Sequence, residues 1–90
     1  DIKVPVSSAT IYPNPASSAI TIALDLKLST NVTISIYDLT GKEVVFVPKQ
    51  WLQSGTHNLE VNVDELTQGL YEVKIITGDH SITKKLLLMD

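Results

Sequence analysis

The side chains best suited to catalysis or metal binding are few in this sequence. It contains two histidines, His57 and His80, and no cysteine. The lack of cysteine excludes a disulfide framework, a thiolate zinc site and a cysteine nucleophile. Neither histidine stands two or four residues from another typical ligand, the spacing at which two side chains share one side of a strand or helix. We interpret both as loop or surface residues.

The adjacent carboxylates Asp64 and Glu65 are the remaining candidates for binding a cation. One such pair between two strands is more typical of a solvated helix start. We expect a helical turn over residues 64–68, capped by Asp64 and ended by Gly69. The motifs of a serine-based triad are absent. The sequence therefore predicts no enzyme, no catalytic residue, no metal site and no cofactor.

Composition and charge narrow the class of protein further. The 90 residues suffice for one small domain, and 43% of them are apolar. Seven Lys, no Arg and ten acidic residues give a net charge of -3, the wrong sign for a nucleic-acid partner. No apolar run reaches the roughly 18 residues of a membrane-spanning helix. Because the sequence begins without Met on a short Pro-containing lead, we expect it to be part of a longer polypeptide.

Alternation of apolar and polar residues recurs in short runs, which is the pattern of half-buried strands. Ile20, Ile22 and Leu24 form one such apolar set, and Tyr71, Val73 and Ile75 form another. We expect seven strands, at residues 8–12, 18–25, 31–37, 43–48, 57–63, 70–77 and 80–88. Short strands with one apolar face each are best buried as two packed sheets. The predicted fold class is therefore all-β, an immunoglobulin-like antiparallel β-sandwich without a disulfide.

Turn-forming residues separate the expected strands. Asp38 can accept hydrogen bonds from the amides of a tight turn in which Gly41 takes a positive φ, with Lys42 beside it. Gly78 and Asp79 fit a two-residue hairpin loop. These stretches predict a hairpin over residues 34–44 and a second hairpin between the runs that end at Thr77 and begin at His80.

Two further stretches carry unusual residue combinations. Pro13 and Pro15 flank Asn14, which predicts a rigid corner between the first two strands. Gly69 ends the crossover before Tyr71, whose hydroxyl needs a partner if the ring enters a buried strand.

The last expected strand carries an adjacent pair of lysines, Lys84 and Lys85. Because neighbouring residues of a strand point to opposite faces, at least one of the two must face solvent and be available to a partner. Lysines on an edge strand also discourage unwanted strand pairing, and this alternative stays open.

Taken in order, these motifs resemble a known family. Tyr12-Pro13-Asn14-Pro15, then Ile36 to Lys42, then Leu66 with Gly69 and Tyr71, then Lys84 to Leu88 are similar to the type A C-terminal sorting domain of the type IX (Por) secretion system of Bacteroidetes. The resemblance covers residues 11–89. Family members often finish on a basic residue, whereas this sequence finishes on Asp90.

The resemblance implies that the domain is a secretion signal. Such a domain directs its cargo from the periplasm across the outer membrane, to the cell surface or the medium. The implied partners are the outer-membrane translocon and a sortase-like peptidase, which in many members removes the domain and joins the cargo to lipopolysaccharide. By this reading residues 1–7 link to an upstream cargo, residues 8–90 are the sorting domain, and cleavage falls near Val6-Ser7-Ser8. The oligomeric state stays open.

The residues that the machinery would read are those of the motifs: Pro13, Asn14, Pro15, Asp38, Gly41, Lys42, Gly69, Tyr71, Lys84 and Lys85. The alternative function is a carbohydrate-binding or adhesive accessory module, in which the rings of Trp51 and Tyr12 would offer stacking faces. Loss of glycan binding in Trp51→Ala would favour that alternative.

Overall fold

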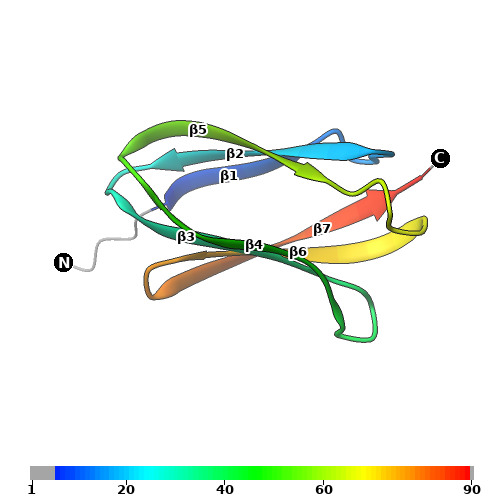
Figure 1. Ribbon diagram of the computed structural model, residues 1–90. Helices are drawn as coiled ribbons and strands as arrows, with labels where there is room; N and C mark the ends of the chain where they lie inside the picture. The colour runs from blue at the N-terminus through cyan, green and yellow to red at the C-terminus, as the bar shows by residue number, and fades with distance from the viewer. Residues whose placement is uncertain (1–5, 90) are drawn as a thin grey trace.

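Two antiparallel sheets packed face to face make up the computed structural model, which describes residues 6–89 (Figure 1). No helix occurs in that range. The seven strands are β1 (Val6–Tyr12), β2 (Ala19–Leu26), β3 (Thr30–Tyr37), β4 (Glu43–Leu52), β5 (Gly55–Asn62), β6 (Gly69–Thr77) and β7 (His80–Leu88). The predicted all-β sandwich of seven strands is confirmed.

The strand order makes the carboxyl-terminal strand an edge strand. One sheet has the order β1-β2-β5 and the other the order β4-β3-β6-β7. In constant-type immunoglobulin domains the fourth strand joins the first, second and fifth. Here β4 pairs with β3 in the other sheet, which leaves β4 and β7 at the two edges of the four-stranded sheet.

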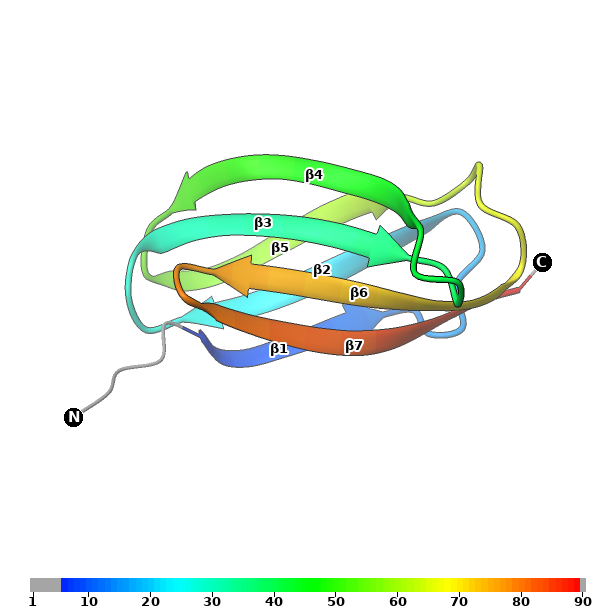
Figure 2. The same cartoon turned by 90° about the horizontal axis from the view of Figure 1, so that it is seen from below.

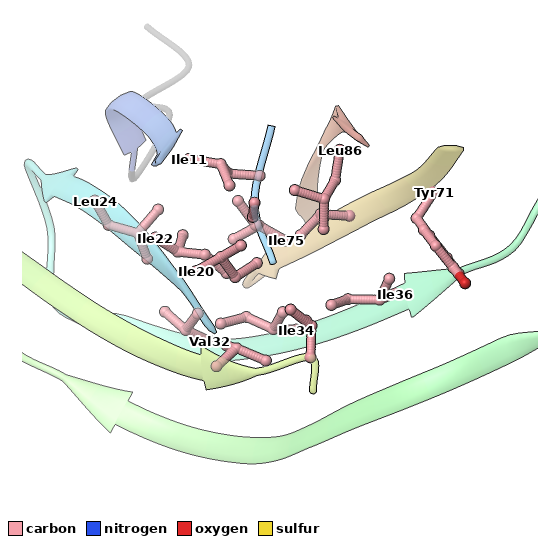
Figure 3. Packing of buried hydrophobic residues seen from close by; sticks show 14 of the residues in the cluster. Ile11, Ile20, Ile22, Leu24, Val32, Ile34, Ile36, Tyr71, Ile75 and Leu86 are labelled. Carbon is pink, nitrogen blue, oxygen red and sulfur yellow. The ribbon is translucent and has the colours of Figure 1, made fainter. Parts of the chain in front are cut away.

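The core lies between the sheets and is built from the alternating apolar residues of the central strands. Their side chains point toward one another from both layers (Figure 3). Completely or almost completely buried residues are Ile20, Ile22, Leu24, Val32, Ile34, Ile36, Val73, Ile75, Leu86 and Leu88. Each such side chain contributes about 1.5–3 kcal/mol relative to an exposed position, which suits a chain without disulfides. The inward faces predicted from periodicity are confirmed.

Both predicted tight turns are present. Gly78 has a φ of +60°, and among residues 6–89 no residue other than glycine has a positive φ, so in the Gly78-Asp79 loop only the first central residue has one. This is the pattern of a type II′ hairpin turn, which favours Gly at that position. Gly41 has a φ of +90° in the loop between β3 and β4, as expected from its place in the motif.

Three expectations about element boundaries need correction. β4 continues to Leu52, four residues beyond the predicted end, because Pro48 lies on an edge strand beside a register shift and therefore interrupts no continuous ladder. Residues 64–68 form no helical turn. A turn closed by a 3.1 Å hydrogen bond from the Leu66 amide to the Val63 carbonyl takes its place, and the Asn62 side chain accepts the Asp64 amide hydrogen bond.

The amino-terminal boundary also differs from the expectation. β1 begins at Val6, so two residues assigned to the linker belong to the strand. Val6 pairs with Leu26, and Ser7 lies at a register shift between the pairs of Val6 and Ser8. The remainder of the expected linker, residues 1–5, and the last residue, Asp90, lie outside the described residues.

Candidate recognition site around the carboxyl-terminal strand

The four sequence motifs lie at one end of the sandwich. In an antiparallel fold the chain reverses at each strand, so the β1–β2, β3–β4 and β5–β6 connections share an end with the carboxyl terminus of β7. Figures 1 and 2 show these three loops and the C-terminus together, opposite the N-terminus. Motifs that are spread over residues 12–88 are therefore neighbours in space.

The Pro-Asn-Pro corner holds the end of β7. The Asn14 side chain accepts a hydrogen bond from the Leu87 amide at 3.0 Å and donates one to the Lys85 carbonyl at 3.0 Å. Two residues on, the Ala16 amide donates to the Leu87 carbonyl at 2.9 Å, and the Ala16 carbonyl accepts from the Met89 amide at 2.8 Å. The corner therefore adds a short parallel bridge to the outer edge of the last strand.

Lys84 and Lys85 are both exposed, on opposite faces of β7. Lys84 lies directly opposite the buried Val73, so it is on the core-facing side of the strand. It reaches solvent because the sandwich is open between the edges of β7 and β1. A cleft of about 230 Å³ there is lined by Ala9, Thr10, Ile11, Asn14, Lys84 and Lys85.

The loop after β3 is ordered by one carboxylate. Asp38 Oδ1 accepts hydrogen bonds from the Thr40 hydroxyl at 2.6 Å, the Thr40 amide at 2.9 Å and the Lys42 amide at 3.1 Å. The hydroxyl of Thr40, followed by the amide of Lys42, lowers the pKa of Asp38 below its usual value. The predicted role of Asp38 as acceptor for the turn amides is confirmed.

The crossover before β6 contains Gly69 and Tyr71. Gly69 has a φ of +146°, which other residues rarely adopt. Tyr71 is buried, and its hydroxyl donates a 2.6 Å hydrogen bond to the Thr67 carbonyl. Both residues therefore have a structural role at this end of the sandwich: Gly69 through its backbone conformation and Tyr71 through its buried, hydrogen-bonded side chain.

A shallow, mainly apolar hollow lies between the β3–β4 loop and β7, the strand that carries Lys84 and Lys85. It has a volume of about 210 Å³ and is lined by Leu39, Leu70, Tyr71, Glu72 and Lys85. Leu39 is 71% exposed and Leu70 is 48% exposed. Sequence reasoning missed these two leucines. Leu70 breaks the alternation as an apolar residue on an outward position, and that irregularity was the available signal.

The residues considered for catalysis are not brought together. His57 is on β5 and His80 is on β7, in different sheets, and His57 Nε2 lies 2.6 Å from the Gln53 carbonyl. Asp64 and Glu65 are exposed in the turn after β5. Within residues 6–89 no group of three or more His, Cys, Asp or Glu side chains is placed to hold a metal.

The two aromatic rings considered for carbohydrate stacking are also apart. Trp51 is 62% exposed near the end of β4, opposite Asn31 at the start of β3. Tyr12 is at the end of β1 that carries the corner. Because those strand ends lie at opposite ends of the sandwich, the two rings cannot form one platform.

In the described range there is also no helix of the length and apolarity needed to cross a membrane.

A small β-sandwich whose motifs converge on one end and on an edge strand has the organisation of a recognition domain. A family model described as "Secretion system C-terminal sorting domain" matches residues 10–89. The chain therefore belongs to this family, the C-terminal sorting domains of type IX secretion. A domain of this kind directs cargo across the outer membrane and is a non-catalytic signal.

Comparison with solved structures supports the fold independently. The chain is similar to part of dimeric latent PorU from Porphyromonas gingivalis, with a TM-score of 0.69 and 19% sequence identity. The similarity covers 90% of this chain and 9% of the PorU chain, so it concerns a small part of that protein. At this identity the likeness shows the fold. A search of curated proteins gives no match.

Proposed function

We propose that the secretion machinery reads the motif-bearing end of the sandwich, with Lys84 and Lys85 as the charged centre of the signal. The observation that carries this proposal is the exposure of both lysines on opposite faces of one edge strand, next to the three motif loops. They are the chain's one adjacent pair of basic residues. Gly41, Gly69, Asp38 and Tyr71 act by shaping this end rather than by direct contact.

The partners follow from that role. The outer-membrane translocon binds the folded domain, which arrives from the periplasm, and a sortase-like peptidase acts on it afterwards. The part of the chain before Val6 connects the sandwich to the cargo. Val6 is buried and paired with Leu26, and the Ser7 hydroxyl donates to Asp25 Oδ2 at 2.7 Å. Because these residues are held in the sheet, processing takes place before Val6. The domain itself carries no enzymatic activity.

The experiment fuses residues 1–90 to a reporter exported to the periplasm of a type IX-competent host and measures its surface display. Deleting residues 81–90 would remove Leu86 and Leu88 from the core, so loss of display in that variant would report unfolding as well as loss of the signal. The double variant Lys84→Glu/Lys85→Glu leaves the core intact. We expect it to abolish or strongly reduce display.

The matched control is Lys27→Glu/Lys49→Glu, which makes the same charge change at two exposed positions outside the site. We expect the control to be displayed like the unaltered domain. Equal display of both double variants would show that the lysine pair is not read.

A further inference from the structure

The outer edge of β7 is covered over part of its length. The inner edge pairs with β6 from His80 to Leu88. On the outer edge, the groups from the Lys85 carbonyl to the Met89 amide are bonded to Asn14 and Ala16. Earlier along the same edge, at Ser81 and Thr83, no backbone partner is present among residues 6–89. The corner therefore covers the end of the strand and leaves its first half open.

The Asn14 carboxamide takes the place of a peptide group. A parallel neighbour would present one N–H and one C=O to β7 at this point, but Pro13 and Pro15 have no N–H. The Asn14 side chain supplies both, because its NH₂ donates to the Lys85 carbonyl and its oxygen accepts from the Leu87 amide. Ala16 continues the bridge with its own backbone. Asn is the residue whose amide is short enough to act in this way beside two prolines.

We propose that Asn14 is a positioning residue of the sorting signal: its side chain holds residues 85–89 in strand register, and the machinery reads the strand thus held rather than Asn14. Leu86 and Leu88 anchor the inner side of this segment in the core, while the corner bonds secure its outer edge. Without the Asn14 bonds the Leu87 amide and Lys85 carbonyl lose their partners and the outer edge frays. The Lys85 backbone carbonyl is one of the bonded groups, so the Asn14 side chain acts directly on the backbone of one of the two lysines.

The first measurement is amide hydrogen exchange by NMR on the domain and on Asn14→Ala. We expect exchange at Leu87 to rise about tenfold, the size expected for the loss of one hydrogen bond, with a smaller rise at Met89. Exchange at the core residue Ile75 should stay unchanged. Asn14→Asp keeps an acceptor for the Leu87 amide and loses the donor to the Lys85 carbonyl. Its exchange rate at Leu87 should therefore lie between the rates of the unaltered domain and of Asn14→Ala. Asn58→Ala, on β5 of the other sheet, is the matched control.

The second measurement is surface display of the reporter fusion. Asn14→Ala should reduce display in proportion to the increase in Leu87 exchange, although Lys84 and Lys85 are unchanged. Reduced display with unchanged Leu87 exchange would overturn the proposal, since Asn14 would then be contacted directly. Faster exchange with full display would overturn it as well. If even the unaltered fusion is not displayed, the proposed sorting role of this chain is wrong. Unchanged Leu87 exchange in Asn14→Ala refutes the positioning role of Asn14 whatever the display result.

Discussion

The Tyr71 hydroxyl donates a 2.6 Å hydrogen bond to the carbonyl of Thr67, four residues earlier in the chain. The Thr67 hydroxyl also lies 3.2 Å from the same phenol oxygen. Tyr71 stands near the start of β6, just after the crossover from the other sheet. This arrangement corresponds to the tyrosine corner of immunoglobulin-like sandwiches, in which a tyrosine near the start of the sixth strand bonds back to the preceding crossover. It ties the β5–β6 connection to the core.

Tyr71→Phe is expected to lower the free energy of unfolding by about 0.5–1.5 kcal/mol, the net value of one intramolecular hydrogen bond. The ring would stay in the core, so only the bond to Thr67 is lost. Urea unfolding followed by tryptophan fluorescence measures the change. Tyr37→Phe is the control, because Tyr37 is half-buried and its hydroxyl makes no hydrogen bond within residues 6–89. Equal losses in both variants would contradict a structural role for the corner.

Val73→Asp is expected to destabilise the domain by several kcal/mol or to prevent folding, because it transfers a carboxylate from water into the apolar core. Lys84 lies directly opposite on β7, but its side chain is exposed to solvent rather than buried beside position 73. Val73 has no exposed surface and belongs to the hydrophobic core cluster, to which both sheets contribute residues. Thr83→Asp puts the same residue at an exposed position of β7 and should change stability by about 0.5 kcal/mol or less. The melting temperature of each variant measures these changes in stability. An unchanged melting temperature for Val73→Asp would refute the assignment of Val73 to the core-facing side of β6.

Much of this fold could be predicted because strands with one buried face have a period of two. Ile20 to Leu24 and Tyr71 to Ile75 alternate cleanly, and their inward residues are buried as expected. β4 was predicted too short because an edge strand has weaker alternation and tolerates Pro48. The supposed helical turn after Val63 failed because Asn62, rather than Asp64, supplies the capping side chain.

The site was predicted only as a set of residues. The grouping of the motif loops at one end depends on the number of strands between them, and the bonds from Asn14 to Lys85 and Leu87 join residues more than 70 positions apart. No local pattern specifies such a contact. It follows from the packing of the two sheets, which places the β1 edge of one sheet beside the β7 edge of the other and so brings the corner next to the last strand.

Gly69→Ala and Gly69→Val are expected to cost similar amounts, about 1–3 kcal/mol each, because the cost comes from the backbone. Gly69 has a φ of +146°, and an added Cβ would meet no atom within 4 Å. Steric conflict therefore does not distinguish the two substitutions. Chemical denaturation of both variants tests this reasoning. A much larger loss for Val than for Ala would mean that space rather than φ limits this position.

The titration of Asp38 should couple the β3–β4 loop to acid stability. Its pKa is lowered in the folded protein by the Thr40 hydroxyl and then by the Lys42 amide, whereas an unfolded Asp titrates at about 3.9. Since the folded pKa is the lower one, the stabilisation is present above about pH 4 and is lost as the pH falls through the folded pKa. An NMR titration of the Asp38 carboxyl should show the low pKa, and Thr40→Val should raise it toward the unfolded value.

Asp38→Asn keeps a side-chain oxygen for the Lys42 amide but removes the titrating group. Its free energy of unfolding should therefore fall less steeply than that of the unaltered domain as the pH drops below about 4. Asp79→Asn removes the same charge in the hairpin at the opposite end and should leave the Asp38 titration in place. If Thr40→Val does not shift the Asp38 pKa, the hydroxyl bond is not its main cause, and the loop owes its order to the backbone amides.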